Sequence, residues 1–367
     1  MKKETFALYL RELWNIVALP LSFATGTPFT KPTVFAFYLT SRCNSRCQMC
    51  DFWKNPNVAG ELTYEDICTI LRDLKQFGVR VISFSAEGEV FTRPDALDIL
   101  RFSKELGFTF SINSNGLAIN ESLASQLAEI APTSIIFSID TTDPQQYQEI
   151  RGVKNGLERV LQSIRLLQEK GFHRVSAGAV IRHDNLDQIP KLLELARQNG
   201  LHGFRFTAMQ RYGFSKDWDD AQWNRLAEPH YQAALQKALD GLTQTNTPRH
   251  MANTRMYLEM IPAYYQSPHF YPVPCIEGYY KGKILPNGDL SLCPIMGKTA
   301  VIGNLKAESV ASLWWSDKAR QVRRLIREKK CPGCWLSCYG EDNLRFSLRY
   351  GLRANWKAFL RATRLLQ

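Results

Sequence analysis

Residues 40–51, "TSRCNSRCQMCD", place three cysteines within eight positions, directly after the apolar run "TVFAFYL" at 33–39. Three thiols are an odd number for disulfide pairing and one fewer than the ligands of a closed structural zinc site. A loop with the spacing CxxxCxxC can instead wrap three thiolates around one face of a four-iron cluster. The fourth iron then lacks a protein ligand, and it can bind a cofactor or a substrate.

The sequence around this loop repeats one unit, a short β-prone run followed by a helical pattern. The β-prone runs are 33–39, 79–85, 108–113, 134–140, 174–181 and 203–209. The helical patterns between them, which often end in Gly, are 63–78, 94–107, 120–131, 157–171 and 187–200. This alternation predicts parallel strands joined by right-handed crossovers. Six units are too few for an eightfold barrel, so we expect an α/β fold, a partial (β/α)6 TIM-like barrel of parallel strands, with its site at the C-terminal ends of the strands.

The other cysteines and the bulk composition limit the class of protein. Five more cysteines fall in a second group, and Cys68 stands alone on a helical pattern, where we expect a small buried residue. Grouped cysteines without a convincing signal peptide favour metal ligation in a reducing compartment, so we expect a cytoplasmic protein. No apolar run is long enough to span a bilayer. The net charge of +11 leaves nucleic acid, an anionic membrane or an acidic substrate to consider, although cluster-bound thiolates would offset part of it.

The cysteine loop after the first strand of a β/α repeat resembles the radical S-adenosylmethionine (SAM) superfamily. Three later segments agree: "EGEVFTRPD" (87–95) is similar to the family's GGEPLLRPD, "SNG" (114–116) to its TNG, and "FSIDTTDPQQYQEIRG" (137–152) to its SxDG…RG segment. The resemblance covers about residues 33–210. It implies that Cys43, Cys47 and Cys50 hold a 4Fe–4S cluster whose open iron binds SAM. Reductive cleavage then gives a 5′-deoxyadenosyl radical that abstracts hydrogen from a substrate.

The same resemblance implies a set of residues that help to place SAM: Gly88, Glu89, Asn115, Ser138, Asp140 and Arg151. Glu89 is expected near the SAM amino group, Ser138 and Asp140 at the ribose, and Arg151 on the carboxylate side. The sequence departs from the family at Glu87, which replaces a glycine, and at Val90, which replaces a proline. Glu87 could therefore add a second carboxylate near SAM or the substrate.

The second cysteine group resembles the SPASM and Twitch extensions of radical SAM enzymes. "CIEGYYKGKILPNGDLSLC" (275–293) matches their CX9–15GX4C opening, and "CPGCWLSC" (331–338) supplies later ligands. A hairpin is expected over 282–294. The resemblance implies one auxiliary 4Fe–4S cluster on Cys275, Cys293, Cys331 and Cys334, while Cys338 either replaces one of these or stays free. A zinc ribbon is the alternative.

The chain divides into five expected segments: an amphipathic N-terminal helix and lead-in (1–32), the radical SAM core (33–211), a linker with a helix near 221–242 (212–274), the SPASM/Twitch-like cluster domain (275–344) and a basic C-terminal helix (345–367). In the last segment Arg345, Arg349, Arg353, Lys357 and Arg361 recur at every fourth position. Three interpretations stay open for it: a helix docked on the barrel, a helix on an anionic membrane surface, or a contact with a leader peptide or RNA.

The expected function is a radical SAM enzyme acting on an unidentified substrate. Residues 1–32 are too few for a leader-peptide-binding domain, which favours a small molecule, a glycoside or a lipid-linked compound. A maturase that modifies a ribosomal peptide is the alternative, and a zinc-containing nucleic-acid-binding protein is the alternative of another class. Expected partners are an electron donor such as flavodoxin or ferredoxin and a membrane surface; nucleic acid is not expected.

Overall fold

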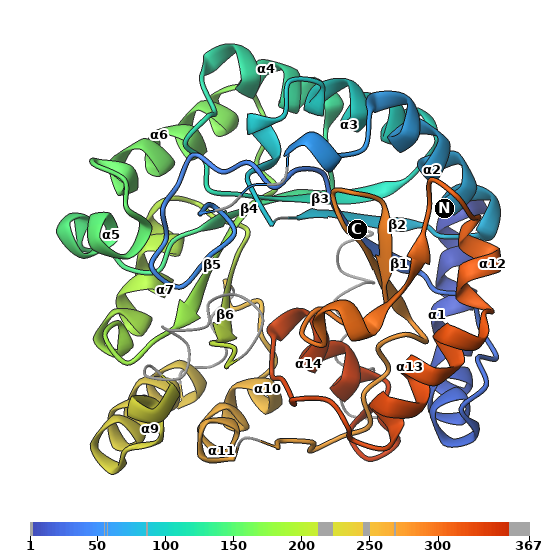
Figure 1. The fold of residues 1–367 in the computed structure, drawn as a ribbon. Helices are drawn as coiled ribbons and strands as arrows, with labels where there is room; N and C mark the ends of the chain where they lie inside the picture. The colour runs from blue at the N-terminus through green and yellow to red at the C-terminus, as the bar shows by residue number, and fades with distance from the viewer. Residues whose placement is uncertain are drawn as a thin grey trace.

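The computed structural model describes residues 3–54, 56, 58–85, 87–211, 223–244, 250–267 and 269–351. Its core is a curved sheet of parallel strands with helices around the outside (Figure 1). The six predicted strands are confirmed as β1 (Val34–Tyr38), β2 (Val81–Ser85), β3 (Thr109–Ser114), β4 (Ser134–Ser138), β5 (Val175–Ile181) and β6 (Gly203–Ala208). Each pairs in parallel with the next, as expected for right-handed crossovers.

The predicted crossover helices are also confirmed. They are α2 (Tyr64–Phe77), α3 (Ala96–Glu105), α4 (Glu121–Ile130), α6 (Gly156–Glu169) and α7 (Ile189–Gln198). At the start of α2 the Thr63 hydroxyl accepts from the Asp66 N–H at 3.1 Å, and the Asp66 carboxylate accepts from the Thr63 N–H at 3.0 Å. Gly78, at φ 104°, ends the helix in the left-handed region. An additional helix, α5 (Pro144–Arg151), precedes α6.

The two faces of the strands differ in side-chain size. Outward positions such as Phe37, Phe84 and Ile135 are fully buried under the helices. Inward positions include Ala36 and Ser83, which are small and only partly buried. TIM barrels normally fill this interior with layers of bulky branched residues. Here the outer layer carries the apolar core, and the inside of the barrel is left open.

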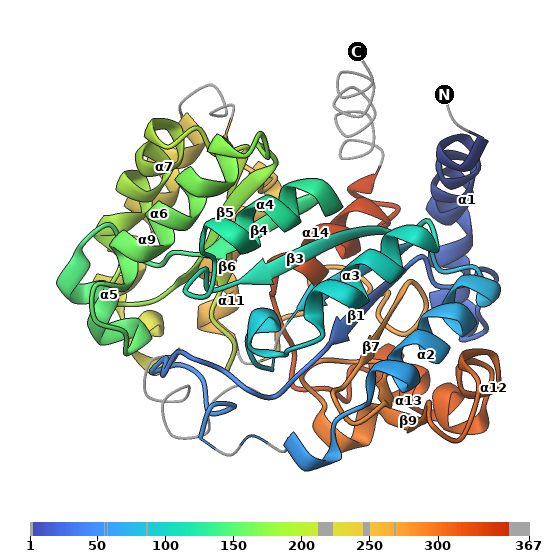
Figure 2. The same ribbon diagram turned by 90° about the horizontal axis from the view of Figure 1, so that it is seen from above.

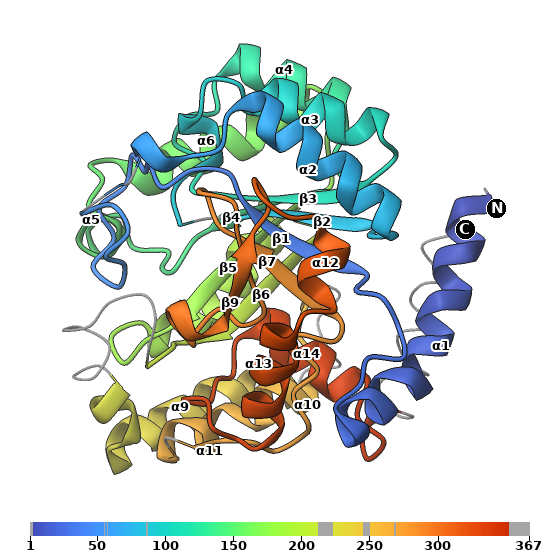
Figure 3. The same cartoon turned by 45° about the vertical axis from the view of Figure 1, so that its right-hand side comes forward.

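The C-terminal extension continues the same sheet. β7 (Lys281–Ile284) pairs in parallel with β1, and β8 (Asp289–Ser291) and β9 (Val301–Asn304) follow in antiparallel pairing. β7 and β8 form the predicted hairpin, whose turn contains Gly288 at φ 89°. Figure 3 shows α12 (Val310–Trp314) and α13 (Asp317–Arg327) beside this part of the sheet. The strand order is therefore β6-β5-β4-β3-β2-β1-β7-β8-β9, with the predicted core and the predicted extension in one sheet.

The remaining helices are α9 (Pro229–Gln244), α10 (Arg255–Glu259), α11 (Ile261–Gln266) and α14 (Ser337–Arg345). A helical stretch at 223–227 precedes α9, in the region of the helix predicted near 221–242. α14 bridges the two sides of the barrel opening (Figure 1). Its Ser337 hydroxyl lies 2.6 Å from the Thr207 hydroxyl on β6, and the Lys281 ammonium on β7 donates to the Cys338 carbonyl at 2.5 Å and pairs with Asp342.

The predicted N-terminal helix is α1 (Lys3–Thr25), which lies within the expected segment 1–32 and continues past Pro20. Its Leu19 packs in a small cluster with Tyr279, Tyr280 and Phe346. None of the described helices is both long and apolar enough to span a bilayer. Most of the predicted basic C-terminal helix, residues 352–367, lies outside the described residues.

Candidate functional site

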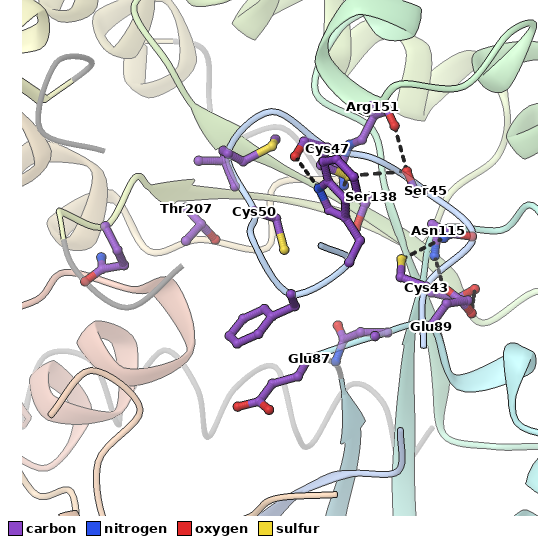
Figure 4. A pocket seen from close by; sticks show the side chains of 18 of the residues that line it. Cys43, Ser45, Cys47, Cys50, Glu87, Glu89, Asn115, Ser138, Arg151 and Thr207 are labelled. Carbon is purple, nitrogen blue, oxygen red and sulfur yellow. Dashed lines mark hydrogen bonds between the residues drawn. The ribbon is translucent and has the colours of Figure 1, made fainter. Parts of the chain in front are cut away.

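The three clustered thiols line one cavity at the C-terminal ends of the barrel strands. Cys43, Cys47 and Cys50 come from the loop after β1, and the cavity has a volume of about 280 Å³. Figure 4 shows this loop facing residues that follow β2, β3 and β4, with Thr207 of β6 at the other side of the cavity. The cavity therefore lies at the C-terminal edge of the sheet, where the site was predicted.

The segment "RG" (151–152) holds one side of the cysteine loop. The carbonyl oxygen of Arg151 accepts from the Arg46 N–H at 3.1 Å and from the Ser45 hydroxyl at 2.8 Å. Gly152 has φ 65°, and a Cβ atom there would lie 2.7 Å from the Arg46 carbonyl oxygen. The glycine thus allows both the left-handed turn at the end of α5 and the close approach of the loop.

Gly88 has the same role on the opposite side. The Glu89 N–H donates to the Arg42 carbonyl at 2.7 Å, and a Cβ atom on Gly88 would overlap that carbonyl. The start of the loop is held by Glu61, whose carboxylate accepts from the Ser41 N–H at 2.6 Å. The backbone of the loop is therefore fixed independently of any bound group.

The "RPD" segment (93–95) anchors the strand that leads into the loop. The Arg93 guanidinium is buried and donates to the Leu39 and Leu62 carbonyls, both at 2.9 Å, while it pairs with Asp95 at 2.6 Å. A buried arginine that satisfies backbone carbonyls in this way acts as a structural brace. It does not line the cavity.

Hydrogen-bond donors surround the sulfur atoms. Ser45 Oγ lies 3.3 Å from Cys47 Sγ, Arg151 Nη1 lies 3.6 Å from the same sulfur, and Asn115 Nδ2 lies 4.0 Å from Cys43 Sγ. Burial raises the pKa of the Cys50 thiol to about 11, so the polypeptide alone favours the neutral thiol there. A thiolate at Cys50 is therefore favoured by a bound cation, and hydrogen-bond donors beside the other sulfurs would stabilise sulfur ligands of a cluster.

The donor set and the cavity fit an iron–sulfur cluster. Three sulfur ligands from one loop surround a space whose other walls come from the barrel. Within the described part of the chain, no three His, Cys, Asp or Glu side chains converge closely enough to hold a single metal ion. The thiols are instead distributed around the cavity.

Five of the six predicted SAM-placing residues line this cavity: Gly88, Glu89, Asn115, Ser138 and Arg151. The sixth, Asp140, is fully buried and lies behind Arg151, with Oδ2 2.5 Å from the Arg151 guanidinium. Its Oδ1 accepts from the Val180 N–H at 2.8 Å. The structure thus places Asp140 where it holds Arg151, and it does not bring Asp140 to the cavity wall.

The two carboxylates of "EGE" (87–89) have different surroundings. Both oxygens of Glu89 accept hydrogen bonds from the "SNG" turn, from the Ser114 hydroxyl at 2.8 Å and from the Asn115 N–H at 2.7 Å. Glu87 lines the cavity, and Figure 4 shows its side chain pointing away from that of Glu89. Burial raises the pKa of Glu87, and the positive charge of Lys283 opposes this shift. Among the described residues no hydrogen bond occupies the Glu87 carboxylate, so Glu87, with Lys283 as its nearby charge, is the carboxylate more available to a ligand.

Several cavity residues were missed by the sequence analysis. Met49, Phe52 and Trp53 form an apolar wall, and the Trp53 indole donates to the Cys47 carbonyl at 3.1 Å. Thr207 and Gln210 complete the side nearest to β6. The aromatic pair directly after the third cysteine and the inward position of Thr207 on its strand were the available signals.

The second cysteine group divides in two. Burial, and then the charges of Cys275, Cys293, Glu277 and Cys331, raise the pKa of the Cys334 thiol, so these groups are near enough to interact electrostatically. Glu277, buried beside them, has its pKa raised to about 8 by burial, and its Oε1 lacks a hydrogen-bond partner in the described part of the chain. Four cysteines with an unsatisfied buried oxygen beside them fit a site completed by an additional group.

Cys338 lies elsewhere. It is on the first turn of α14, and its thiol faces the interior of the barrel among Lys281, Arg205 and Asp342. Both roles expected for Cys338 stay predictions, and its place on the wall of the barrel interior favours the free thiol.

Two family models match the segments that contain the two cysteine groups. Residues 37–196 match the model of the radical SAM superfamily, and residues 275–339 match that of SPASM, an iron–sulfur cluster-binding domain. An AdoMet-dependent heme synthase of Methanosarcina barkeri is 26% identical over 205 residues, which are 55% of this chain and 58% of that protein. The subtilosin biosynthesis protein AlbA of Bacillus subtilis is 22% identical over 328 residues, 84% of this chain and 68% of AlbA. The chain spans about half the length of the curated relatives that it matches most strongly.

The fold is shared with solved structures. SuiB of Streptococcus suis, bound to its precursor peptide SuiA, superposes with a TM-score of 0.64 over 84% of this chain and 70% of the SuiB chain. The sequence identity is 20%, so this likeness concerns the fold alone.

Proposed function

The chain carries a radical SAM domain at 37–196 and a SPASM cluster-binding domain at 275–339, and from this premise we propose that it is a radical SAM enzyme. A 4Fe–4S cluster and SAM, when bound, supply a 5′-deoxyadenosyl radical that abstracts a hydrogen atom from the substrate. The observation that carries the proposal is one cavity lined by three thiols of a single loop together with Gly88, Glu89, Asn115, Ser138 and Arg151.

The cavity residues have separate tasks in this proposal. Cys43, Cys47 and Cys50 hold the cluster. Arg151, kept in place by Asp140, presents a cation to the carboxylate of SAM. Glu87 offers a carboxylate to an ammonium group, and the wall of Met49, Phe52 and Trp53 excludes water from the reacting atoms.

The second group would hold one auxiliary 4Fe–4S cluster. Cys275, Cys293, Cys331 and Cys334 would occupy all of its protein-ligand positions, so this cluster would exchange electrons with the substrate or with an external donor such as flavodoxin or ferredoxin. The unsatisfied buried oxygen of Glu277 beside these thiols supports the presence of an additional group.

The substrate class stays a proposal with two candidates. A small molecule, glycoside or lipid-linked compound is favoured by the enclosed interior of the barrel. A ribosomal peptide is favoured by the likeness to AlbA, named for bacteriocin biosynthesis, and to SuiB, solved with a precursor peptide. The similarity to an AdoMet-dependent heme synthase also favours a small-molecule substrate.

The proposed function is tested by anaerobic purification, iron and sulfide analysis, and chromatography of SAM products under reductant. Cys47→Ala and Cys334→Ala should each lose about half of the iron, because each removes a ligand of a different four-iron cluster. Cys47→Ala should also abolish 5′-deoxyadenosine formation. Cys68→Ala is the matched control, since Cys68 is a buried core residue on α2, and it should keep all of the iron. A colourless protein that binds zinc and leaves SAM intact would contradict the proposal.

We also propose that α1 contacts an anionic membrane surface. Leu10, Leu13, Trp14, Val17 and Leu21 recur at helical spacing, and their side chains are 43–59% exposed. Figure 2 shows α1 at the margin of the molecule, and its other face, which carries Ala18, Leu19 and Ser22, is buried. A continuous apolar stripe of this kind inserts at the boundary between lipid headgroups and acyl chains.

The charge beside this stripe favours lipid over another apolar partner. Arg345 pairs with Glu12 of α1 at 3.0 Å, so the basic segment 345–367, which contains no acidic residue, begins next to the stripe. Sedimentation with vesicles of phosphatidylglycerol and phosphatidylcholine should recover the protein, and Trp14→Gln/Val17→Gln should reduce recovery at least fivefold. Equal recovery of both proteins, or a dimer in light scattering that the double variant converts to a monomer, would contradict a lipid contact.

A further inference from the structure

A second cavity occupies the inside of the barrel. Its volume is about 580 Å³, within the range of pockets that enclose small organic ligands. We call it the barrel chamber. It adjoins the thiol-lined cavity, because Ser138, Arg151, Val180 and Thr207 line both spaces. A molecule in the chamber can therefore present an atom to the cofactor side of the site.

Sequence and topology build this chamber. The strands contribute small or polar inward residues, among them Ala36, Ser83, Ser111 and Gly178, where a barrel core would carry bulky ones. At Gly178 a Cβ atom would already lie 3.1 Å from the Arg205 carbonyl oxygen. The open side of the barrel is covered by α14, whose residues 337–339 and 341–342 line the chamber.

Most charged side chains that line the chamber have partners among the described residues, although the Nε–H of Arg151, whose guanidinium pairs with Asp140, has no hydrogen-bond acceptor. Lys281 pairs with Asp342 and also donates to the Cys338 carbonyl. Both oxygens of Glu341 are occupied, Oε1 by the Thr254 N–H at 2.8 Å and Oε2 by the Thr254 hydroxyl at 2.7 Å.

Arg205 on β6 differs from the other charged groups. Among the described residues no hydrogen bond or close ion pair engages its guanidinium, although its positive charge opposes the burial-driven rise in the pKa of the Glu341 carboxyl and of the Cys338 thiol. Arginine binds carboxylate and phosphate groups through two parallel N–H···O bonds. A guanidinium that lines a cavity, and whose N–H groups have no acceptor among the described residues, can therefore bind an anionic group of a ligand.

We propose that the barrel chamber binds a substrate bearing a small anionic group, a carboxylate or a phosphate monoester, and that Arg205 is its specificity-determining residue. This inference rests on the proposed function, because it names the substrate class of the same site. Arg205 and Thr207 both face inward, and two residues along a strand span roughly 6.6 Å. An anion held by Arg205 thus leaves the rest of the molecule extending toward Thr207 and the SAM-side cavity.

Cys338 provides a reporter inside the chamber. It is the exposed member of the nine cysteines, it lines the chamber, and its thiol lies close enough to Arg205 for the two charges to interact. The other cysteines are either proposed cluster ligands or, like Cys68, buried in the core. The rate at which Cys338 is alkylated in the cluster-loaded protein therefore measures how readily a small reagent enters the chamber and reacts there.

The test compares two reagents of similar size, anionic iodoacetate and neutral iodoacetamide, with the modified residue identified by peptide mass spectrometry. The measured quantity is the rate of Cys338 alkylation by iodoacetate divided by the rate with iodoacetamide. This ratio should be roughly tenfold higher in the native protein than in Arg205→Gln, as expected for one nearby charge in a medium of intermediate dielectric. Arg205→Lys should restore most of the ratio. Arg197→Gln, which removes an exposed arginine paired with Glu194 on α7, should leave it unchanged.

Two protectants then distinguish the anion. Inorganic phosphate and acetate are each added to test whether they slow the modification of Cys338 by iodoacetamide. The ion that protects Cys338 in the native protein, but not in Arg205→Gln, shows whether the anionic group of the substrate is a phosphate or a carboxylate. An unmodified Cys338, or equal reagent ratios in the native protein and Arg205→Gln, overturns the proposal. These readouts need no SAM turnover, so failure here is distinguishable from failure of the proposed function, which would appear as absent SAM cleavage.

Discussion

The carbonyl oxygen of Arg46 lies 2.7 Å from the position that a Cβ atom on Gly152 would occupy. The cysteine loop after β1 and the end of α5 are therefore in contact through backbone atoms, across more than a hundred residues of sequence. This contact orients Cys47, whose neighbour Arg46 donates its N–H to the Arg151 carbonyl.

Gly152→Ala should lower stability and cluster content together. The substitution adds left-handed strain at φ 65° and forces the Arg46 carbonyl away, which costs about 2–4 kcal/mol in total. We expect a lower thermal midpoint and substoichiometric iron at the SAM-side cluster, measured by calorimetry and iron analysis.

Gly171→Ala is the matched control for this substitution. Gly171 has φ 82° but nothing within 4 Å of its Cβ position, so only the strain of about 1 kcal/mol applies. Iron content should stay complete. Equal iron loss in both variants would show that contact with the loop is not what Gly152 provides.

Asp140→Asn should destabilise the protein by about 3 kcal/mol, because it leaves the Arg151 guanidinium with a neutral partner in a buried position. The asparagine oxygen can still accept from the Val180 N–H, so the local backbone is retained. SAM affinity, measured by calorimetric titration, should fall about tenfold as Arg151 loses its fixed orientation. Unchanged affinity would mean that Asp140 serves stability only.

Asp342→Asn should loosen α14. The substitution removes the anionic partner of Lys281 where both side chains are mostly buried, and it should cost about 2–3 kcal/mol. Hydrogen exchange of amides in 337–345 should accelerate. Glu259→Gln, which breaks an exposed pair with Arg255, should change stability by less than about 0.5 kcal/mol.

The cap of α2 should give a pH-dependent contribution. The bonds from the Thr63 N–H and the charge of Lys306 hold the pKa of Asp66 below its ordinary value. A lowered carboxyl pKa stabilises the fold above the unfolded-state pKa of about 3.9, and this contribution is lost as the pH falls through the folded-state value. The thermal midpoint of Asp66→Asn should therefore be lower than that of the native protein at pH 6, by the equivalent of about 0.5–1 kcal/mol, and the difference should shrink below pH 4. A constant difference from pH 6 to 3.5 would contradict this origin.

The strands and crossover helices were predictable because their signals are local. Alternating apolar positions, the Thr63 cap and the glycine stops each act within a few residues. The pairing of β7 with β1 and the position of α14 were not predictable from one sequence, since they depend on contacts between residues hundreds of positions apart. The short sequence pattern of β7 predicts a hairpin, but it does not indicate whether that hairpin joins the edge of the barrel sheet or belongs to a separate domain.

Site residues were predictable where the type of side chain alone determines the chemistry. They were not predictable where the chemistry depends on which hydrogen-bond partners the fold brings to a side chain. The thiol spacing singled out Cys43, Cys47 and Cys50, and these three residues line one cavity in the structure. The difference between Glu87 and Glu89 could not be read from "EGE", because it depends on which carboxylate meets the Ser114 hydroxyl and the Asn115 N–H. The separation of Cys338 from Cys334 likewise depends on where α14 begins.

α14 contacts both β6 and β7, and it lies about 300 positions after β1, the first strand of the sheet along the sequence. During synthesis the strands β1 to β6 leave the ribosome long before that helix exists. Until residues 337–345 are synthesised, a partial barrel would lack the helix that covers this side, and we expect its inner wall to be accessible to iron, sulfide and small ligands. Contacts of such long sequence separation also slow the last folding step.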